Sequence, residues 1–135
     1  MAQGPFINRA PDYSDLDLDF FAHPTTKDVM IKTGEDAVKR SIRNLLFTNF
    51  YDRPFRHNIG SNVTRMLFDN VTPMTAMFLR EAIIETINNF EPRVRVTEVS
   101  VNFDIDNNGF NVTLQYVILN RELPVVTSLF LERIR

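Results

Sequence analysis

The sequence contains no cysteine and no tryptophan, and only four of its 135 residues are glycine. The lack of cysteine excludes disulfides and thiolate metal sites and fits a reducing compartment. Four scattered glycines cannot form a phosphate-binding loop. No stretch approaches the roughly 18 uninterrupted apolar residues of a membrane helix, and the N-terminus has no basic segment followed by an apolar core. We therefore expect a soluble, intracellular protein with no membrane partner.

The overall charge gives little reason to expect a polyanionic partner. The formal net charge is −2 and the isoelectric point is near 5.6, so the chain as a whole does not attract nucleic acid. Residues 49–60, NFYDRPFRHNIG, combine aromatic side chains with Arg53, Arg56 and His57, which could stack on bases and neutralise phosphates. This cluster is short, and aromatic residues in such a loop more often pack it onto the core. We expect no nucleic-acid partner.

Catalytic motifs are missing as well. The two histidines, His23 and His57, lie in separate loop segments without the spacing of a metal site. There is no GxSxG motif, and the sequence supports no pairing of a nucleophile with a base. A glycosidase needs two carboxyl groups facing across a cleft, whereas Glu81 and Glu85, one helical turn apart, are typical of a solvated helix face. The residues therefore indicate neither an enzyme nor a cofactor.

The segment DIDNNGF resembles the start of a calcium-binding loop. Asp104, Asp106, Asn108 and Gly109 match D-x-D-x-N-G, but the twelfth position is Gln115, where a bidentate glutamate is required. The flanking residues alternate as strands do. We interpret the segment as a hairpin turn and expect no metal ion.

The N-terminal part of the chain is predicted to be an arm followed by an acidic strand. Residues 1–14 have little periodicity, and we expect an arm ordered only by contacts. In the following SDLDLDFF, acidic and apolar residues alternate, which is the period of a strand with one acidic and one apolar face. Three like charges on one face repel each other, so this strand suits a sheet edge or a site opposite basic groups.

Three helices are predicted, each with a start signal. Thr33, with an aspartate three residues later, resembles a capping box, and Ser61 is a candidate cap for a short helix. Thr72 and Pro73 combine a capping hydroxyl with proline at the first helical position, and the apolar stripe that follows lasts until Pro92. The expected helices span residues 35–48, 62–69 and 73–91.

Three strands are expected after the last helix. Asn108-Gly109 is a favoured pair for a two-residue hairpin turn, and with this turn the apolar faces of the two flanking strands coincide. A final strand occupies residues 125–135. The register expected for the hairpin pairs Ile105 with Val112, Phe103 with Leu114, Val101 with Tyr116 and Val99 with Ile118.

This order of elements predicts an α+β domain over residues 15–135, with three helices packed on one face of a small antiparallel sheet. Such a sheet has open edges, and the acidic strand and the C-terminal strand are the candidates for them. Both lie beside chain ends that could exchange between subunits. The candidate edge residues are Asp15, Leu16, Asp17, Leu18 and Asp19 in the first strand, and Leu129, Phe130 and Leu131 in the last.

The stretch NNFEPRVRV contains a corner between the last helix and the strands. Pro92 cannot continue a helix and pushes Glu91 into the extended region, so Glu91 and Arg93 project to the same side. One interpretation is a local ion pair, worth about 0–1 kcal/mol at a surface. The other is a rigid corner that offers an acceptor and a forked donor to a partner. The residues alone leave both open.

The sequence resembles the baseplate wedge proteins of contractile-tailed bacteriophages, a family shared with a type VI secretion baseplate subunit and known under an old "lysozyme-like" label. The resemblance covers nearly the whole chain from residue 13, and its Glu-Pro-Arg corner stands between the last helix and the hairpin. The matching stretches are YSDLDLDF at 13–20, HPTTKDV at 23–29, GEDAVKRSIRNLLFTN at 34–49, RPFRHNIGSNV at 53–63 and EPR at 91–93.

The resemblance implies a fold similar to the strand-exchanging domain of the tail sheath protein and a place in the virion, in the tail baseplate, after assembly in the bacterial host cytoplasm. It implies that Glu91, Pro92 and Arg93 dock on a helical core bundle of other wedge proteins. The open edges would then be the template on which the first sheath subunit adds a strand. Tail tube or hub proteins are further implied neighbours.

One loop departs from the family, because many relatives have a Pro-Gly-Glu-Arg type of loop where this chain has NFYDRPF. The contacts of that loop therefore do not transfer. Two alternatives to a sheath initiator stay open from the sequence. One is a lysozyme-like enzyme that degrades cell walls, and the other is a scaffold without sheath contact.

Overall fold

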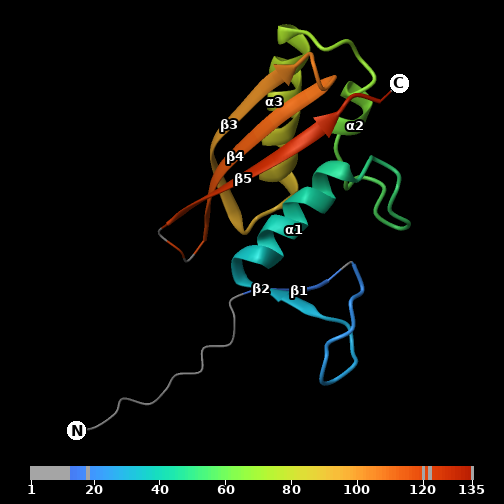
Figure 1. The fold of residues 1–135 in the computed structure, drawn as a ribbon, viewed down its shortest axis with the longest axis vertical. Helices are drawn as coiled ribbons and strands as arrows, with labels where there is room; N and C mark the ends of the chain where they lie inside the picture. The colour runs from blue at the N-terminus through green and yellow to red at the C-terminus, as the bar shows by residue number, and fades with distance from the viewer. Residues whose placement is uncertain (1–12, 18, 120, 122, 135) are drawn as a thin grey trace, which may run out of the picture. The chain divides into compact units, whose positions relative to one another are not determined.

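The computed structural model describes residues 13–134, except Leu18, Asn120 and Glu122 (Figure 1). The chain divides into two compact units, residues 1–40 and 41–135. The expected N-terminal arm lies almost entirely outside the described residues, and a single domain over residues 15–135 stays a prediction. Within the described part of the chain, no helix is long and apolar enough to cross a membrane.

The first unit contains a two-stranded antiparallel sheet. Strand β1 (Ser14–Leu16) pairs with β2 (Ile31–Thr33), and Leu16 lies opposite Ile31. Strand β2 was missed in the sequence because it has only three residues and runs directly into the first helix. Leu16 and Ile31 are both 60% exposed, so the described residues of this small sheet form no apolar core of their own.

The acidic strand is shorter than predicted, and the face that was expected to be acidic is partly buried. The strand ends at Leu16, and the carboxylate of Asp17 accepts a hydrogen bond from the backbone N–H of Asp19, which turns the chain. Asp17 is 1% exposed and lies 3.7 Å from the ammonium of Lys32. Arg40 forms an ion pair with Asp19. The basic groups expected opposite these carboxylates are therefore present, but the segment is no edge of the main sheet.

The three helices are present. Helix α1 (Gly34–Phe47) and helix α3 (Pro73–Phe90) match the predicted ranges within a residue, whereas α2 (Val63–Met66) is a single turn. The Thr72 hydroxyl accepts from the backbone N–H of Thr75, so the predicted cap of α3 is confirmed.

The second unit is built on a three-stranded antiparallel sheet, and α3 runs across one face of it (Figure 1). The strands are β3 (Val94–Asp104), β4 (Gly109–Ile118) and β5 (Pro124–Glu132), with β4 in the centre. The predicted α+β fold with open antiparallel edges is confirmed. The apolar residues buried between α3 and the sheet include Ala76, Leu79, Ile83, Ile87, Phe110, Val112, Leu114, Tyr116 and Ile118.

The predicted hairpin register is wrong by four residues. Phe103 pairs with Phe110 and Val101 with Val112, and the loop between the strands has four residues instead of two. The side-chain amide of Asn107 donates to the Asp104 carboxylate, and the backbone N–H of Asn107 donates to it as well. These hydrogen bonds stabilise the longer loop and lower the pKa of Asp104. A shift by an even number keeps every side chain on its face, so the apolar pattern fits both registers equally well.

Gly109 lies in strand β4 and not in the turn. A Cβ at this position would come within 2.7 Å of the Leu131 carbonyl oxygen and 2.6 Å of the Phe130 ring. The close approach of β5 therefore requires glycine, and Phe130 covers the space that a side chain would occupy.

Candidate partner-binding surfaces

The Glu-Pro-Arg corner starts where α3 ends. Glu91 is the last residue to donate a helical hydrogen bond, from its N–H to the carbonyl of Ile87, and Pro92 then prevents a further turn. Arg93 donates through Nε to one oxygen of the Glu91 carboxylate at 2.6 Å and through a terminal nitrogen to the other at 3.1 Å. Ser41 of α1 donates its hydroxyl hydrogen to this second oxygen.

Glu91 is 4% exposed, and burial by itself raises the pKa of a carboxyl group. The hydrogen bonds from Arg93 and Ser41, together with the positive charge of Arg93, outweigh burial and lower the pKa of Glu91 below its ordinary value of 4.5. The group is therefore a buried carboxylate whose two oxygens are both occupied.

The corner thus contains the local ion pair between Glu91 and Arg93. Its exposed surface is formed by Pro92 and by part of Arg93, and not by Glu91. Pro92 is exposed, and the Arg93 side chain is 21% exposed, whereas the Glu91 side chain is 5% exposed. The buried Glu91 carboxylate holds the Arg93 guanidinium through these two hydrogen bonds. Partner binding by the corner stays a prediction, and the geometry narrows the contact surface to Pro92 and Arg93.

One hydrogen bond just beyond the end of β5 shows to which side of the strand each residue points its backbone N–H and C=O groups. The N–H of Arg133 donates to the carbonyl of Asn108, so Arg133 turns its backbone towards β4. Directions alternate along an antiparallel strand, so Val126, Ser128 and Phe130 turn their N–H and C=O groups to the outer side. The bond from the N–H of Ile134 to the Leu67 carbonyl fits this alternation, because it also lies on the outer side.

The outer edge of β5 is therefore open over most of its length. Among the described residues, no backbone bond to the outward groups of Val126, Ser128 or Phe130 is formed outside the sheet. Leu129 and Leu131 turn their backbones towards β4, so Phe130 is the member of the predicted trio that presents its backbone. The Val126 side chain is 58% exposed and that of Phe130 is 46% exposed.

The opposite edge of the sheet, along β3, is partly blocked. The same alternation turns the carbonyl of Val99 outward, and there it accepts a hydrogen bond of 2.9 Å from Nε of Arg80 on α3. A bulge between Val96 and Glu98 also interrupts the ladder next to this point. A strand added to β3 would have to displace Arg80.

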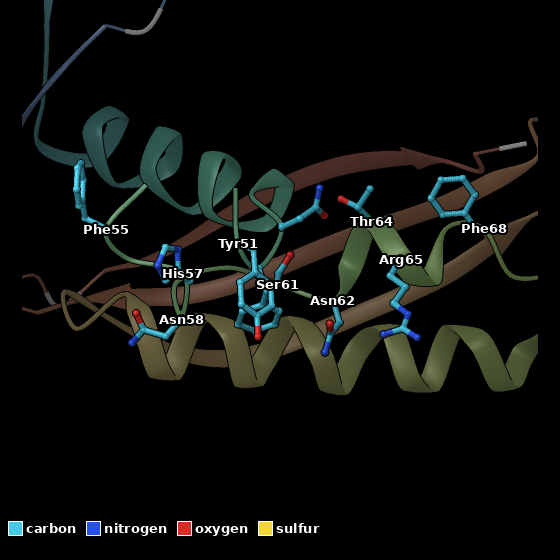
Figure 2. Close-up of a pocket in the computed structure, with 11 residues that line it drawn as sticks. Tyr51, Phe55, His57, Asn58, Ser61, Asn62, Thr64, Arg65 and Phe68 are labelled. Atoms are coloured by element: carbon cyan, nitrogen blue, oxygen red, sulfur yellow. The ribbon is translucent and has the colours of Figure 1, made fainter. Parts of the chain in front are cut away.

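The loop between α1 and α2 forms a third surface, which the sequence pointed to only as a basic and aromatic cluster. A pocket of about 770 Å³ opens between residues 49 and 68, and Figure 2 shows Tyr51, His57 and Asn62 along it, with Phe55 and Phe68 at opposite ends of the view. The loop is closed by the N–H of Ser61, which donates to the Thr48 carbonyl. No group of acidic or histidine side chains suited to a metal ion occurs among the described residues.

We expect Gly60→Ala to destabilise this loop. A Cβ at position 60 would lie 2.5 Å from the backbone nitrogen of Phe50 and 2.6 Å from the carbonyl carbon of Asn49, and neither backbone atom can move alone. Overpacking of this kind costs about 2 kcal/mol, measurable by urea unfolding. The exposed Asn58→Ala is the control, and equal stability of the two variants would contradict the tight packing.

The profile of the family described as baseplate wedge protein gp25 matches residues 32–122 of the sequence. The chain belongs to this family. A curated relative, the baseplate wedge protein gp25 of Enterobacteria phage T4, is 29% identical over 108 residues, which are 80% of this chain and 81% of the relative. The family assignment makes the protein a structural component of a baseplate wedge in a contractile tail, as the resemblance implied.

Solved structures share the fold. A chain of the anti-feeding prophage baseplate is 22% identical, with a TM-score of 0.71, over 82% of this chain and 88% of that one. A chain of the pyocin R2 baseplate after contraction is 18% identical, with a TM-score of 0.54, over 87% and 98% of the two chains. A Geobacter sulfurreducens protein described as a proposed tail lysozyme is 19% identical, with a TM-score of 0.63, over 76% and 96%.

Proposed function

We propose that the protein docks on other wedge proteins through Pro92 and Arg93 and starts sheath polymerisation by accepting a strand at the outer edge of β5. The observation that carries this proposal is the row of outward backbone groups at Val126, Ser128 and Phe130. An added strand would satisfy these groups with main-chain hydrogen bonds, and side-chain alternation would fix its register.

The two edges of the sheet favour different roles. Edge strands left open over several residues invite strand pairing, and most proteins cover or charge them. Here β5 carries the exposed Val126 and Phe130 beside its open backbone, whereas β3 has Arg80 on its outward carbonyl. We therefore assign strand addition to β5. The sequence predicted open edges without choosing between them, and this proposal selects the β5 edge.

The docking proposal gives Glu91 a positioning role. Two hydrogen bonds from Arg93 and one from Ser41 hold the carboxylate, so it orients the guanidinium without touching the partner. An arginine whose guanidinium is held in a fixed orientation suits an acidic or carbonyl-rich surface, such as the end of a helical bundle.

The carboxyl groups support a structural role over a lysozyme-like activity. A glycosidase needs a general acid whose pKa is raised. Burial raises the pKa of Glu91, but the hydrogen bonds from Arg93 and Ser41 and the charge of Arg93 outweigh it, so the pKa is lowered and both carboxylate oxygens are occupied. Glu81 and Glu85 are exposed on α3, one turn apart along the helix. We propose that the protein has no enzymatic activity of its own.

Arg93→Lys is the variant that tests docking with the least damage to the fold. Lysine keeps the positive charge beside Glu91 but loses the planar fork, so we expect the affinity for co-purified wedge proteins to fall about tenfold. The exposed Arg95→Lys on β3 is the matched control. Unchanged binding by a folded Arg93→Lys protein would exclude the corner as the dock, even if sheath initiation at β5 holds.

A further inference from the structure

Two bulky aromatic residues in the loop between α1 and α2 have a backbone conformation that such residues rarely adopt. Tyr51 has a φ of 72° and Phe55 a φ of 69°. A positive φ costs a non-glycine residue about 1–3 kcal/mol. Tyr51 is 81% exposed and Phe55 is 96% exposed, so burial within this chain does not offset the cost. Strained, exposed aromatic residues indicate a contact with another molecule.

The pocket beside these residues is shaped before any partner arrives. Tyr51 stacks on His57 with ring centroids 6.2 Å apart, and its N–H donates to the His57 carbonyl. Arg65 of α2 and Phe68, in the turn after α2, complete the wall (Figure 2). The volume of about 770 Å³ is large enough for one bulky side chain and the backbone on either side of it.

The charges around the pocket are unbalanced. Arg65 lines the pocket, and Arg53 and Arg56 lie within two residues of Phe55 in the loop. Among the described residues, none of the three has a carboxylate within ion-pair distance, although the whole chain carries a net charge of −2. The neighbouring carboxylate of Asp52 accepts a hydrogen bond from the backbone N–H of Asn49. Residues 49–69 thus carry three arginines against two aspartates, Asp52 and Asp69, and the surface combines apolar walls with a small excess of positive charge.

We propose that this pocket binds an acidic peptide segment of another protein, with one large apolar side chain inserted between Phe55 and Phe68 and carboxylates near Arg53, Arg56 and Arg65. The surface shares no residue with the Glu91 corner or the β5 edge. The proposal goes beyond docking at the corner and sheath initiation, and it can fail or hold independently of both.

An acidic peptide fits the surface better than a single-stranded nucleic acid, the other polyanion that aromatic and basic side chains bind. Nucleic-acid binding needs a track of stacking platforms along a cationic groove. Here one face of the Tyr51 ring is taken by His57, and the overall negative charge repels a long polyanion. An open pocket with Arg65 in its wall and two further arginines in the adjoining loop suits one anchor residue flanked by carboxylates.

The test is a selection of short random peptides displayed on phage against the whole protein, followed by fluorescence anisotropy with the selected peptide. We expect enrichment of sequences with a large apolar residue among aspartates and glutamates. Binding should weaken about tenfold or more in Phe55→Ala and in Arg65→Gln, and it should weaken with added salt. Arg95→Gln is the matched control and should bind as the wild type does.

Several results would overturn the proposal. One is a selection that enriches no peptide for the wild type over the Phe55→Ala, Arg65→Gln double variant. Another is the enrichment of basic peptides. A third is a peptide that binds both single variants as tightly as it binds the wild type. Preferential binding of a single-stranded oligothymidylate would make the surface a nucleic-acid site. Self-association lost in Phe55→Ala would assign the pocket to a second copy. Phe55 is almost fully exposed, so loss of folding cannot explain the effect of its removal.

Discussion

Baseplates carrying Ser128→Pro are expected to assemble and to remain without sheath. The N–H of Ser128 points away from β4, so proline at this position removes no hydrogen bond of the sheet. It does remove a donor that an incoming strand needs, and its ring obstructs the approach. We therefore expect a folded protein that joins the wedge but supports no sheath polymerisation, scored by electron microscopy of sheath grown on purified baseplates.

The neighbouring position supplies the control. Thr127 turns its backbone towards β4, so Thr127→Pro breaks the ladder inside the protein and should cost about 3 kcal/mol of stability. Val126→Lys tests the same edge without proline, because a charge on an edge strand opposes pairing. Normal sheath growth on baseplates with both Ser128→Pro and Val126→Lys would exclude this edge as the template.

Glu91→Ala should lower the free energy of unfolding by about 3 kcal/mol, because it leaves Arg93 and Ser41 without their acceptor in a buried place. The exposed Glu85→Ala on the same helix should change it by about 0.5 kcal/mol or less. Urea unfolding monitored by circular dichroism measures both. Equal midpoints for the two variants would mean that the buried ion pair contributes nothing.

The same carboxylate makes stability depend on pH. The pKa of Glu91 is lower in the folded than in the unfolded chain, so its contribution is present above the ordinary value of 4.5 and is lost as the pH falls through the folded pKa. Glu91→Gln should therefore lose less stability than the wild type between about pH 5 and about pH 3. Parallel curves for the two proteins over this range would contradict the lowered pKa.

Local signals in the sequence were enough to place α1 and α3. The short helix α2 is a single turn, and its candidate cap was wrong, because the Ser61 hydroxyl donates to the Leu46 carbonyl and Asn62 precedes the helix. The Thr72 cap and Pro73 depend on residues within one turn, and the structure confirms both. The faces of β4 were also predictable, because alternation depends on the strand alone. Val112, Leu114, Tyr116 and Ile118 are all buried.

Features that depend on distant residues were not predictable. The hairpin register is set by the hydrogen bonds of Asp104 and by the approach of β5 to Gly109, while the apolar pattern fits two registers. Asp17 is buried because Lys32 lies beside it, fifteen positions further along the chain. The direction of each β5 carbonyl follows from the register, so the open edge could be narrowed to particular residues only in three dimensions.

The Glu-Pro-Arg corner was predictable from the sequence only in part. Its position between helix and strand was clear from Pro92, and the resemblance to the wedge family singled it out. Ser41, which lies fifty residues away and holds Glu91 from α1, gave no signal in the sequence. The sequence therefore located the corner, while the structure distinguishes a buried carboxylate, Glu91, from a partly exposed arginine, Arg93.

The central claim is that a sheath strand pairs with the outer edge of β5, and hydrogen exchange at single backbone amides tests it most directly. In the free protein, the amides of Val126, Ser128 and Phe130 should exchange fast, while those of Thr127, Leu129 and Leu131 are protected by β4. After sheath protein is added to baseplates, the three outward amides should become protected as well. Sheath bound with these three amides still exchanging fast would contradict strand addition at β5.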